Sequence, residues 1–173
     1  MARVASFHLI RERPGRALLA MARLGADRPQ LQRVPGLKFW KLLGTGNGDD
    51  TGPGADLRRT ALFAVWESEE HLDDFLASHR IPRRWQRAEE HFTVRLRALG
   101  GHGTWRGVDP LDGMVDGDRA GRVAVITRAD VRRRSWRDFA AAGKEVDAEL
   151  HTAAGLIDVV GVDQCLLGSE CPG

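Results

Sequence analysis

The sequence predicts an α+β fold, built from short strands and from helices that each have one apolar face. Residues 60–66 form an almost unbroken apolar run of strand length, which indicates a strand covered on both faces. Ser68 and two glutamates follow, as is typical of a helix N-terminus. The next residues recur at the spacing of one helix face: Leu72, Phe75, Leu76 and His79. A strand followed by an amphipathic helix therefore organises the middle of the chain.

Further strands and another helix are expected around this centre. Residues 4–10 and 37–43 are predicted to be strands, and the alternating residues 92–97 a strand with one wet face. Residues 17–24 are predicted to form a helix. Its apolar face is expected to hold Leu18, Met21 and Ala22. The resulting order, β-α-β-β-α-β, is that of a ferredoxin-like unit.

The second half of the chain repeats features of the first at a constant separation. Residues 122–124 repeat residues 3–5, and residues 155–156 repeat residues 36–37. This spacing predicts a duplication in which Val4 and Val123 occupy matching strand positions. The counterpart of residue 61 would fall beyond the last residue, so the second unit is expected to be incomplete.

A helix is predicted between the two repeated segments of the second half. Ser135 and Asp138 have the spacing of a capping box, and apolar residues recur at helical intervals as far as Leu150. We therefore expect a first ferredoxin-like unit over residues 1–110 and a partial second unit over residues 120–173, together forming one compact domain.

Composition and charge exclude several classes of protein. The chain has 173 residues and a formal net charge of +2, which is too small to indicate nucleic-acid binding. No apolar run is long enough for a transmembrane helix, and the N-terminus lacks the core of a signal peptide. The expected location is the cytoplasm. The absence of tyrosine excludes mechanisms that need a tyrosine acid.

Four ordered segments of the chain resemble the spheroidene monooxygenase-like (CrtA-like) family of the dimeric α+β barrel superfamily: residues 37–46, 61–66, 75–78 and 102–107. The resemblance covers about residues 3 to 160. It implies duplicated ferredoxin-like units whose sheets pack face to face in a dimeric α+β barrel, and a homodimer. It also implies a monooxygenase, haem-dependent in this family, that acts on an apolar small molecule such as a carotenoid.

A haem enzyme needs an axial ligand in an apolar pocket and cations for the propionates. His102 lies among glycines near a tryptophan, and His79 lies on an apolar helix face, so these two are the candidate catalytic histidines. Both also have simpler interpretations, as a loop residue and as a helix-end residue. His8 alternates with apolar strand residues and is expected to be a hydrogen-bonded core residue. The metal ligands remain unassigned.

Arginines and tryptophans supply the remaining candidates. Arg84 and Arg97 are the candidate cofactor-binding residues, because guanidinium groups pair with carboxylates. The same arginines could form a solvated face balanced by nearby glutamates. The candidate substrate-binding residues are Trp40, Trp66 and Trp105, because each indole offers a flat apolar wall.

Two further classes of function stay open at this point. A cofactor-free cyclase or isomerase of natural-product biosynthesis could use an apolar pocket to fold a flexible substrate into its reactive shape. A ligand-binding module without catalysis would need only the pocket. A Soret band in the visible spectrum distinguishes the haem-dependent class from both.

Overall fold

The computed structural model describes residues 3–45, 56–112, 114, 121–127 and 133–163 of the chain. One antiparallel sheet runs through it in the strand order β4-β1-β3-β2-β5. Its strands are β1 (Val4–Arg11), β2 (Leu37–Thr45), β3 (Arg59–Trp66), β4 (Glu90–Leu96) and β5 (Val162–Asp163). The helices are α1 (Ala17–Ala26), α2 (Arg28–Leu31), α3 (Glu69–Ser78), α4 (Arg80–Trp85) and α5 (Trp136–Thr152), the last preceded by a 3₁₀ turn, Arg133–Ser135.

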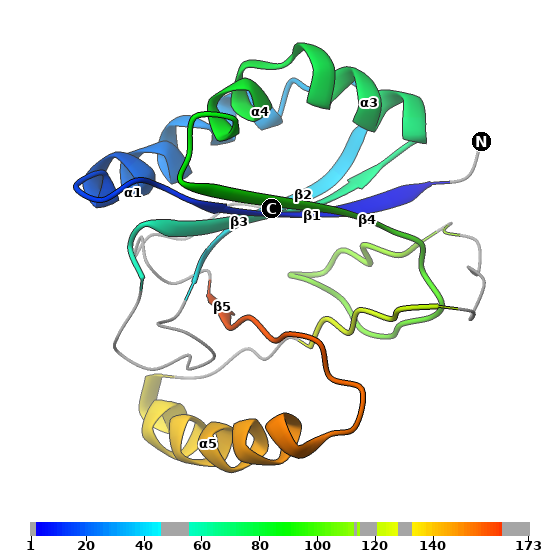
Figure 1. Cartoon of the computed structure of the whole chain (residues 1–173). Helices are drawn as coiled ribbons and strands as arrows, with labels where there is room; N and C mark the ends of the chain where they lie inside the picture. The colour runs from blue at the N-terminus through cyan, green and yellow to red at the C-terminus, as the bar shows by residue number, and fades with distance from the viewer. Residues whose placement is uncertain (1–2, 46–55, 113, 115–120, 128–132, 164–173) are drawn as a thin grey trace.

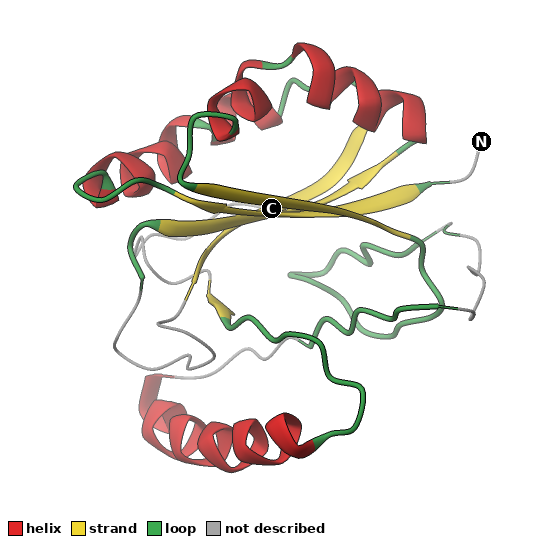
Figure 2. Cartoon of the chain, in the orientation of Figure 1, coloured by secondary structure: helices red, strands yellow, loops and turns green. Residues whose placement is uncertain are grey.

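Helices α1 to α4 cover one face of the sheet, and the second half of the chain lies on the other side (Figures 1 and 2). The strand order β4-β1-β3-β2 confirms the ferredoxin-like unit that the sequence predicts. Among its described residues, the second half contributes α5 with its 3₁₀ turn and the two-residue strand β5, which pairs with Gly44 and Thr45 of β2. Helix α5 and strand β5 are the main regular elements in the described part of the predicted second unit.

Each face of the sheet carries its own apolar core, because successive strand residues point to opposite sides. The helix-side core centres on Leu62, Trp66, Leu72 and Phe75. The other face, here called the open face, carries a second set of buried apolar residues: Ala5, Phe39, Leu43, Ala61, Phe63, Val65 and Trp105. β3 is buried on both faces from Ala61 onward, as its apolar run predicts.

Val123 does not lie on a strand, so the prediction of matching strand positions is wrong. Residues 121–127 are irregular, and Val123 is 61% exposed. A strand needs a neighbour to satisfy its backbone groups, and within the described residues the only pairing of the second half is the short one between β5 and β2. The capping box is also not formed, because the Ser135 side chain makes no capping hydrogen bond.

The predicted inward face of α1 is wrong as well. Ala20 and Leu24 are buried against the sheet, whereas Leu18 is 85% exposed. The sequence of this helix is apolar on every side except at Arg23, so periodicity alone does not determine which face packs. Arg23 pairs with Glu12 beyond the end of β1, and this contact sets the rotation of the helix.

Truncation of Leu72 is expected to destabilise the fold, because its side chain is fully buried in the helix-side core. Leu72→Ala should lower the free energy of unfolding by about 2–5 kcal/mol. Leu18→Ala is the matched control and should change it by less than about 0.5 kcal/mol, since Leu18 is exposed. Urea unfolding followed by circular dichroism measures both, and equal losses would contradict the assigned packing of α1 and α3.

Candidate functional site

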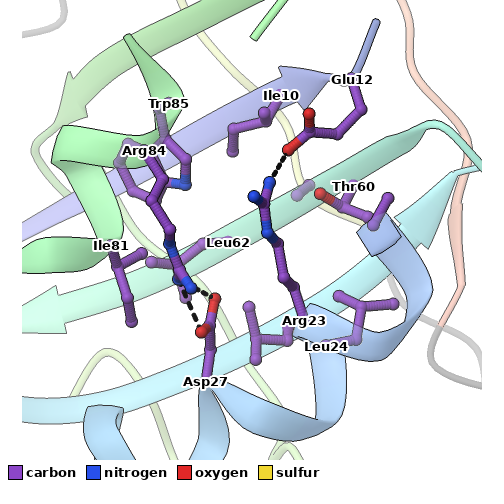
Figure 3. A pocket seen from close by; sticks show the side chains of 13 residues that line it. Ile10, Glu12, Arg23, Leu24, Asp27, Thr60, Leu62, Ile81, Arg84 and Trp85 are labelled. Carbon is purple, nitrogen blue, oxygen red and sulfur yellow. Dashed lines mark hydrogen bonds and ion pairs between the residues drawn. The ribbon is translucent and has the colours of Figure 1, made fainter. Parts of the chain in front are cut away.

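A small cavity lies between α1, α4 and the helix-side face of the sheet (Figure 3). Its volume is about 30 Å³, which is room for one or two water molecules. Apolar side chains form most of its wall, among them Ile10, Leu24, Leu42, Leu62, Ile81 and Trp85. The cavity therefore brings together residues from β1, β2, β3 and two helices at one point.

Two buried ion pairs line the same cavity. Glu12 and Asp27 are each 5% exposed; Glu12 pairs with Arg23, and Nη2 of Arg84 donates to both carboxylate oxygens of Asp27, at 2.6 and 2.7 Å. Figure 3 shows both pairs on the wall of the cavity. Each carboxylate is matched by one guanidinium group, so the wall carries polar groups without net charge. Such a wall suits a neutral guest, because a charged one would meet no unpaired countercharge.

A buried polar chain lies behind Trp85. The indole Nε1 of Trp66 donates to Ser6 Oγ at 2.8 Å, and Ser6 Oγ lies 2.8 Å from His8 Nε2. The other ring nitrogen, His8 Nδ1, lies 2.9 Å from Thr93 Oγ1. Since Ser6 accepts from Trp66, the simplest assignment has the serine hydroxyl donating to Nε2 and Nδ1–H donating to Thr93. The expectation that His8 is a hydrogen-bonded core residue is confirmed.

Burial controls the charge of this histidine. Desolvation lowers the pKa of His8 to about 3, from 6.5 for an ordinary histidine. The imidazole is therefore neutral at physiological pH and acts through its hydrogen bonds. Its ring lies 4.8 Å from that of Trp85, which separates it from the cavity.

Aromatic rings connect two of the predicted site residues to this chain. The Phe75 ring lies 4.9 Å from Trp66 and 5.0 Å from His79. His79 ends α3 and caps α4, where its Nδ1 accepts a hydrogen bond from the Ile81 amide at 3.3 Å. Burial, followed by Arg80 and Arg84, lowers the pKa of His79. The structure thus brings Trp66 and His79 together through Phe75, beside the cavity wall.

The other predicted site residues lie elsewhere. Trp40 is half-buried and packs against the helix-side core. Trp105 lies on the opposite face of the sheet, stacked on Phe63 with ring centroids 6.0 Å apart. His102, three residues before it, is exposed in the same loop. Because the sheet separates them, Trp66 and Trp105 do not contribute to a single pocket.

The two predicted propionate-binding arginines already have carboxylate partners. Arg84 is held by Asp27, and the exposed Arg97 lies 3.0 Å from Glu69 at the start of α3. Arg84 lies on α4, whereas Arg97 directly follows β4. Sequence reasoning did not anticipate the pairing of Arg84 with Asp27, because no motif links residues 57 positions apart.

His8 is expected to make the fold sensitive to acid. Its pKa is about 3 in the fold and near 6.5 when exposed, so the unfolded chain binds the extra proton at intermediate pH. The stability contributed by neutral His8 is complete above about pH 6.5 and declines towards pH 3, by about 1.4 kcal/mol per pH unit. Chemical unfolding of the unsubstituted protein between pH 5 and 6.5 should show a slope that approaches this value towards pH 5, because carboxylates contribute little there. His79, whose pKa is also lowered, adds to it in the same direction.

The variant His8→Gln removes the titrating group and should flatten that slope. His91→Gln replaces an exposed histidine on β4 and serves as the control. The assignment fails if His8→Gln keeps the slope of the unsubstituted protein or if His91→Gln alters it.

The chain is similar in sequence to several curated proteins. No family model matches the chain. Three curated relatives are named spheroidene monooxygenase. The protein from Rubrivivax gelatinosus is 31% identical over 161 residues, covering 90% of this chain and 61% of the relative. Those from Rhodobacter capsulatus and Cereibacter sphaeroides are 26% and 29% identical over 80% and 66% of this chain, and 58% and 36% of their own lengths.

Solved structures resemble the chain more remotely. The Pseudomonas aeruginosa protein PA3566 has a TM-score of 0.44 and 15% identity, covering 58% of this chain and 97% of that one. SnoaB of Streptomyces nogalater, described as a cofactor-independent oxygenase, has a TM-score of 0.40 and 17% identity, covering 58% of this chain and 97% of its own.

The chain spans between about a third and three-fifths of the lengths of the curated relatives it matches. Over that span the similarity confirms the resemblance predicted from the sequence: the chain is a relative of the spheroidene monooxygenases.

Proposed function

We propose that this protein is a tailoring monooxygenase that inserts oxygen into an apolar small molecule. The observation that carries the proposal is the similarity to three proteins named spheroidene monooxygenase, at 26–31% identity. The helix-side cavity supports it, because its wall is largely apolar and carries no net charge. A neutral, largely hydrocarbon substrate matches that wall.

The proposed site is the cavity together with the polar chain behind Trp85. Pockets that enclose small molecules are about 300–1,000 Å³, so a cavity of about 30 Å³ must widen to accept a substrate. The wall best suited to move is α4, which has six residues and is tied to the rest of the helix layer through Arg84 and Arg80. Outward movement of Trp85 on this helix would expose His8 and Ser6 to the guest. With their hydrogen bonds to Thr93 and Trp66 kept, these two residues would form a polar but uncharged end wall of the widened site.

Haem does not fit the helix-side cavity or the candidate residues as they are arranged in this subunit. Both ring nitrogens of His8 are hydrogen-bonded, and Nδ1 of His79 is used by the cap of α4. His102 is exposed, and both candidate arginines pair with carboxylates. The cavity is also about tenfold smaller than a pocket for a ligand of that size. We therefore assign the reaction to the apolar site without routing any step through haem.

The activity is tested by incubating the purified protein with spheroidene and shorter apolar polyenes under ¹⁸O₂, with mass spectrometry of the products. We expect a product that contains one labelled oxygen atom. Trp85→Ala should enlarge the cavity and favour the bulkier substrate over the shorter one by roughly tenfold. Trp105→Phe, on the opposite face of the sheet, should leave that preference unchanged.

Two results would contradict this proposal. One is the absence of labelled product from any of the polyenes in the presence of a reducing system. The other is a strong Soret band when the protein is titrated with haem, which would show that a haem site forms and that the assignment of the reaction without haem is wrong.

We also infer a homodimer formed through the second half of the chain. Several apolar side chains there are exposed in one subunit: Val123, Val125, Ile126 and Ile157. Burying such surface is worth roughly 25 cal/mol per Å². Larger exposed apolar patches mark interaction sites. The homodimer implied by the family resemblance would cover these residues.

Sedimentation at micromolar concentration tests the dimer. The unsubstituted protein should sediment as a dimer, and the double variant Val125→Asp with Ile157→Asp as a monomer, because a carboxylate buried in an apolar interface is costly. Leu18→Gln, which alters an exposed leucine on α1, should remain dimeric. A monomeric unsubstituted protein would rule the dimer out.

A further inference from the structure

The outward face of α1 contains no polar side chain. Leu18 is 85% exposed and Leu19 is 42% exposed. The other exposed positions of this helix are Ala22, Gly25 and Ala26. Its one charged residue, Arg23, turns inward to Glu12 (Figure 3). Surface helices normally present polar residues to water. We therefore expect this face to contact an apolar partner.

Arginines flank this helix in the sequence on both sides. Residues 13–34 contain five arginines and one acidic residue, Asp27, which is buried against Arg84. Arg13 and Arg16 are exposed immediately before the helix, and Arg28 and Arg33 follow it. In the described part of the chain, none of these four forms an ion pair. The margin of the face is therefore positively charged without a local countercharge.

We propose that the outward face of α1 docks on a lipid surface that carries anionic headgroups. An apolar helix face flanked by cations is the pattern of helices that lie in a membrane interface, with the apolar side in the acyl boundary and the cations among the headgroups. A second copy of this chain is a poor occupant, because a symmetric contact would bring the arginines of both copies together. Lipid supplies both the apolar layer and the negative charge.

The opposite side of the same helix lines the cavity. Ala20, Arg23 and Leu24 face inward to it, while Leu18 faces outward. Docking would therefore place the proposed reaction site one helix away from the membrane. This step rests on the proposed function, since an apolar polyene would be dissolved in lipid and would reach the cavity past α1. Docking itself does not depend on catalysis.

Vesicle flotation of the whole 173-residue chain tests the docking surface. Phosphatidylcholine vesicles containing phosphatidylglycerol are compared with vesicles of phosphatidylcholine alone, at low and high salt. The protein should float with the anionic vesicles, and binding should weaken as salt rises. Leu18→Gln should weaken it at least tenfold. Glutamine preserves the helix, and residue 18 has no role in the core. Val146→Gln on α5 is the matched control and should bind normally.

The arginines are tested separately. Arg13→Gln with Arg16→Gln should weaken binding by about fivefold for each charge removed. The control, Arg122→Gln with Arg134→Gln, removes two exposed arginines of the second half and should have no such effect. The proposal is overturned if the protein does not float with anionic vesicles, or if both pairs of substitutions weaken binding equally. It is also overturned if Leu18→Gln leaves flotation intact.

The docking and the activity can fail independently. Flotation without labelled product would keep the docking surface and remove the proposed reaction. Labelled product from detergent-dispersed polyene, without flotation, would support the proposed reaction and overturn the docking surface. Dissociation of a solution dimer by Leu18→Gln, with flotation unchanged, would assign the face to a second copy and overturn the lipid proposal.

Discussion

The ion pair between Asp27 and Arg84 is the contact on which the helix layer depends. It joins the end of α1 to α4 across the cavity, with both carboxylate oxygens engaged by one guanidinium nitrogen. Burying such a pair costs desolvation energy, so its contribution to net stability is small or unfavourable. The ion pair matters more for the orientation of the helices than for the free energy of unfolding. Together with the pair between Glu12 and Arg23 it determines which side of an otherwise apolar helix faces the sheet. The cavity and the outward face of Leu18 both follow from that choice.

The buried polar chain from Trp66 to Thr93 imposes a second constraint. It crosses three strands, since Trp66 lies on β3, Ser6 and His8 on β1, and Thr93 on β4. The indole Nε1, the serine Oγ and both imidazole nitrogens each have a hydrogen-bond partner. These hydrogen bonds allow an imidazole to be buried in an apolar core. A slip of one residue in the β1 register would place Ser6 and His8 on the open face and leave the Trp66 indole without its acceptor. The polar chain therefore favours one register of β1 against β3, in which Ser6 and Trp66 share the helix-side face.

Local sequence patterns were enough to predict the strands and helices of the first unit. They were not enough to predict features that depend on contacts between residues far apart in the sequence. The strand and helix around residues 60–79 were predictable because apolar runs and helical periodicity are properties of neighbouring residues. The rotation of α1 was not predictable, because its sequence is apolar on every side except at Arg23. The side that packs on the sheet is the one from which Arg23 reaches Glu12. Trp66 and His79 were candidates on local grounds; both contact Phe75, whose ring lies 6.1 Å from that of Trp85, but neither lines the cavity. The separation of Trp105 from them was not predictable, because Trp105 lies in a loop after β4 and its packing against Phe39 and Phe63 on the open face is a long-range contact.

The two exposed apolar surfaces differ in their charged surroundings, and this difference separates their partners. Around the outward face of α1 every exposed charged residue from Arg13 to Arg33 is an arginine. Helix α5, which follows the exposed valines Val123 and Val125 in the sequence, carries both signs of charge, including exposed Asp138 and Glu149. A surface with mixed charges can complement a copy of itself, because each sign finds its opposite across a two-fold axis. A surface with one sign cannot, and it is complemented only by a partner of the opposite charge. The same chain thus has one apolar surface suited to its own copy and another suited to an anionic lipid layer, at the helix that lines the proposed site.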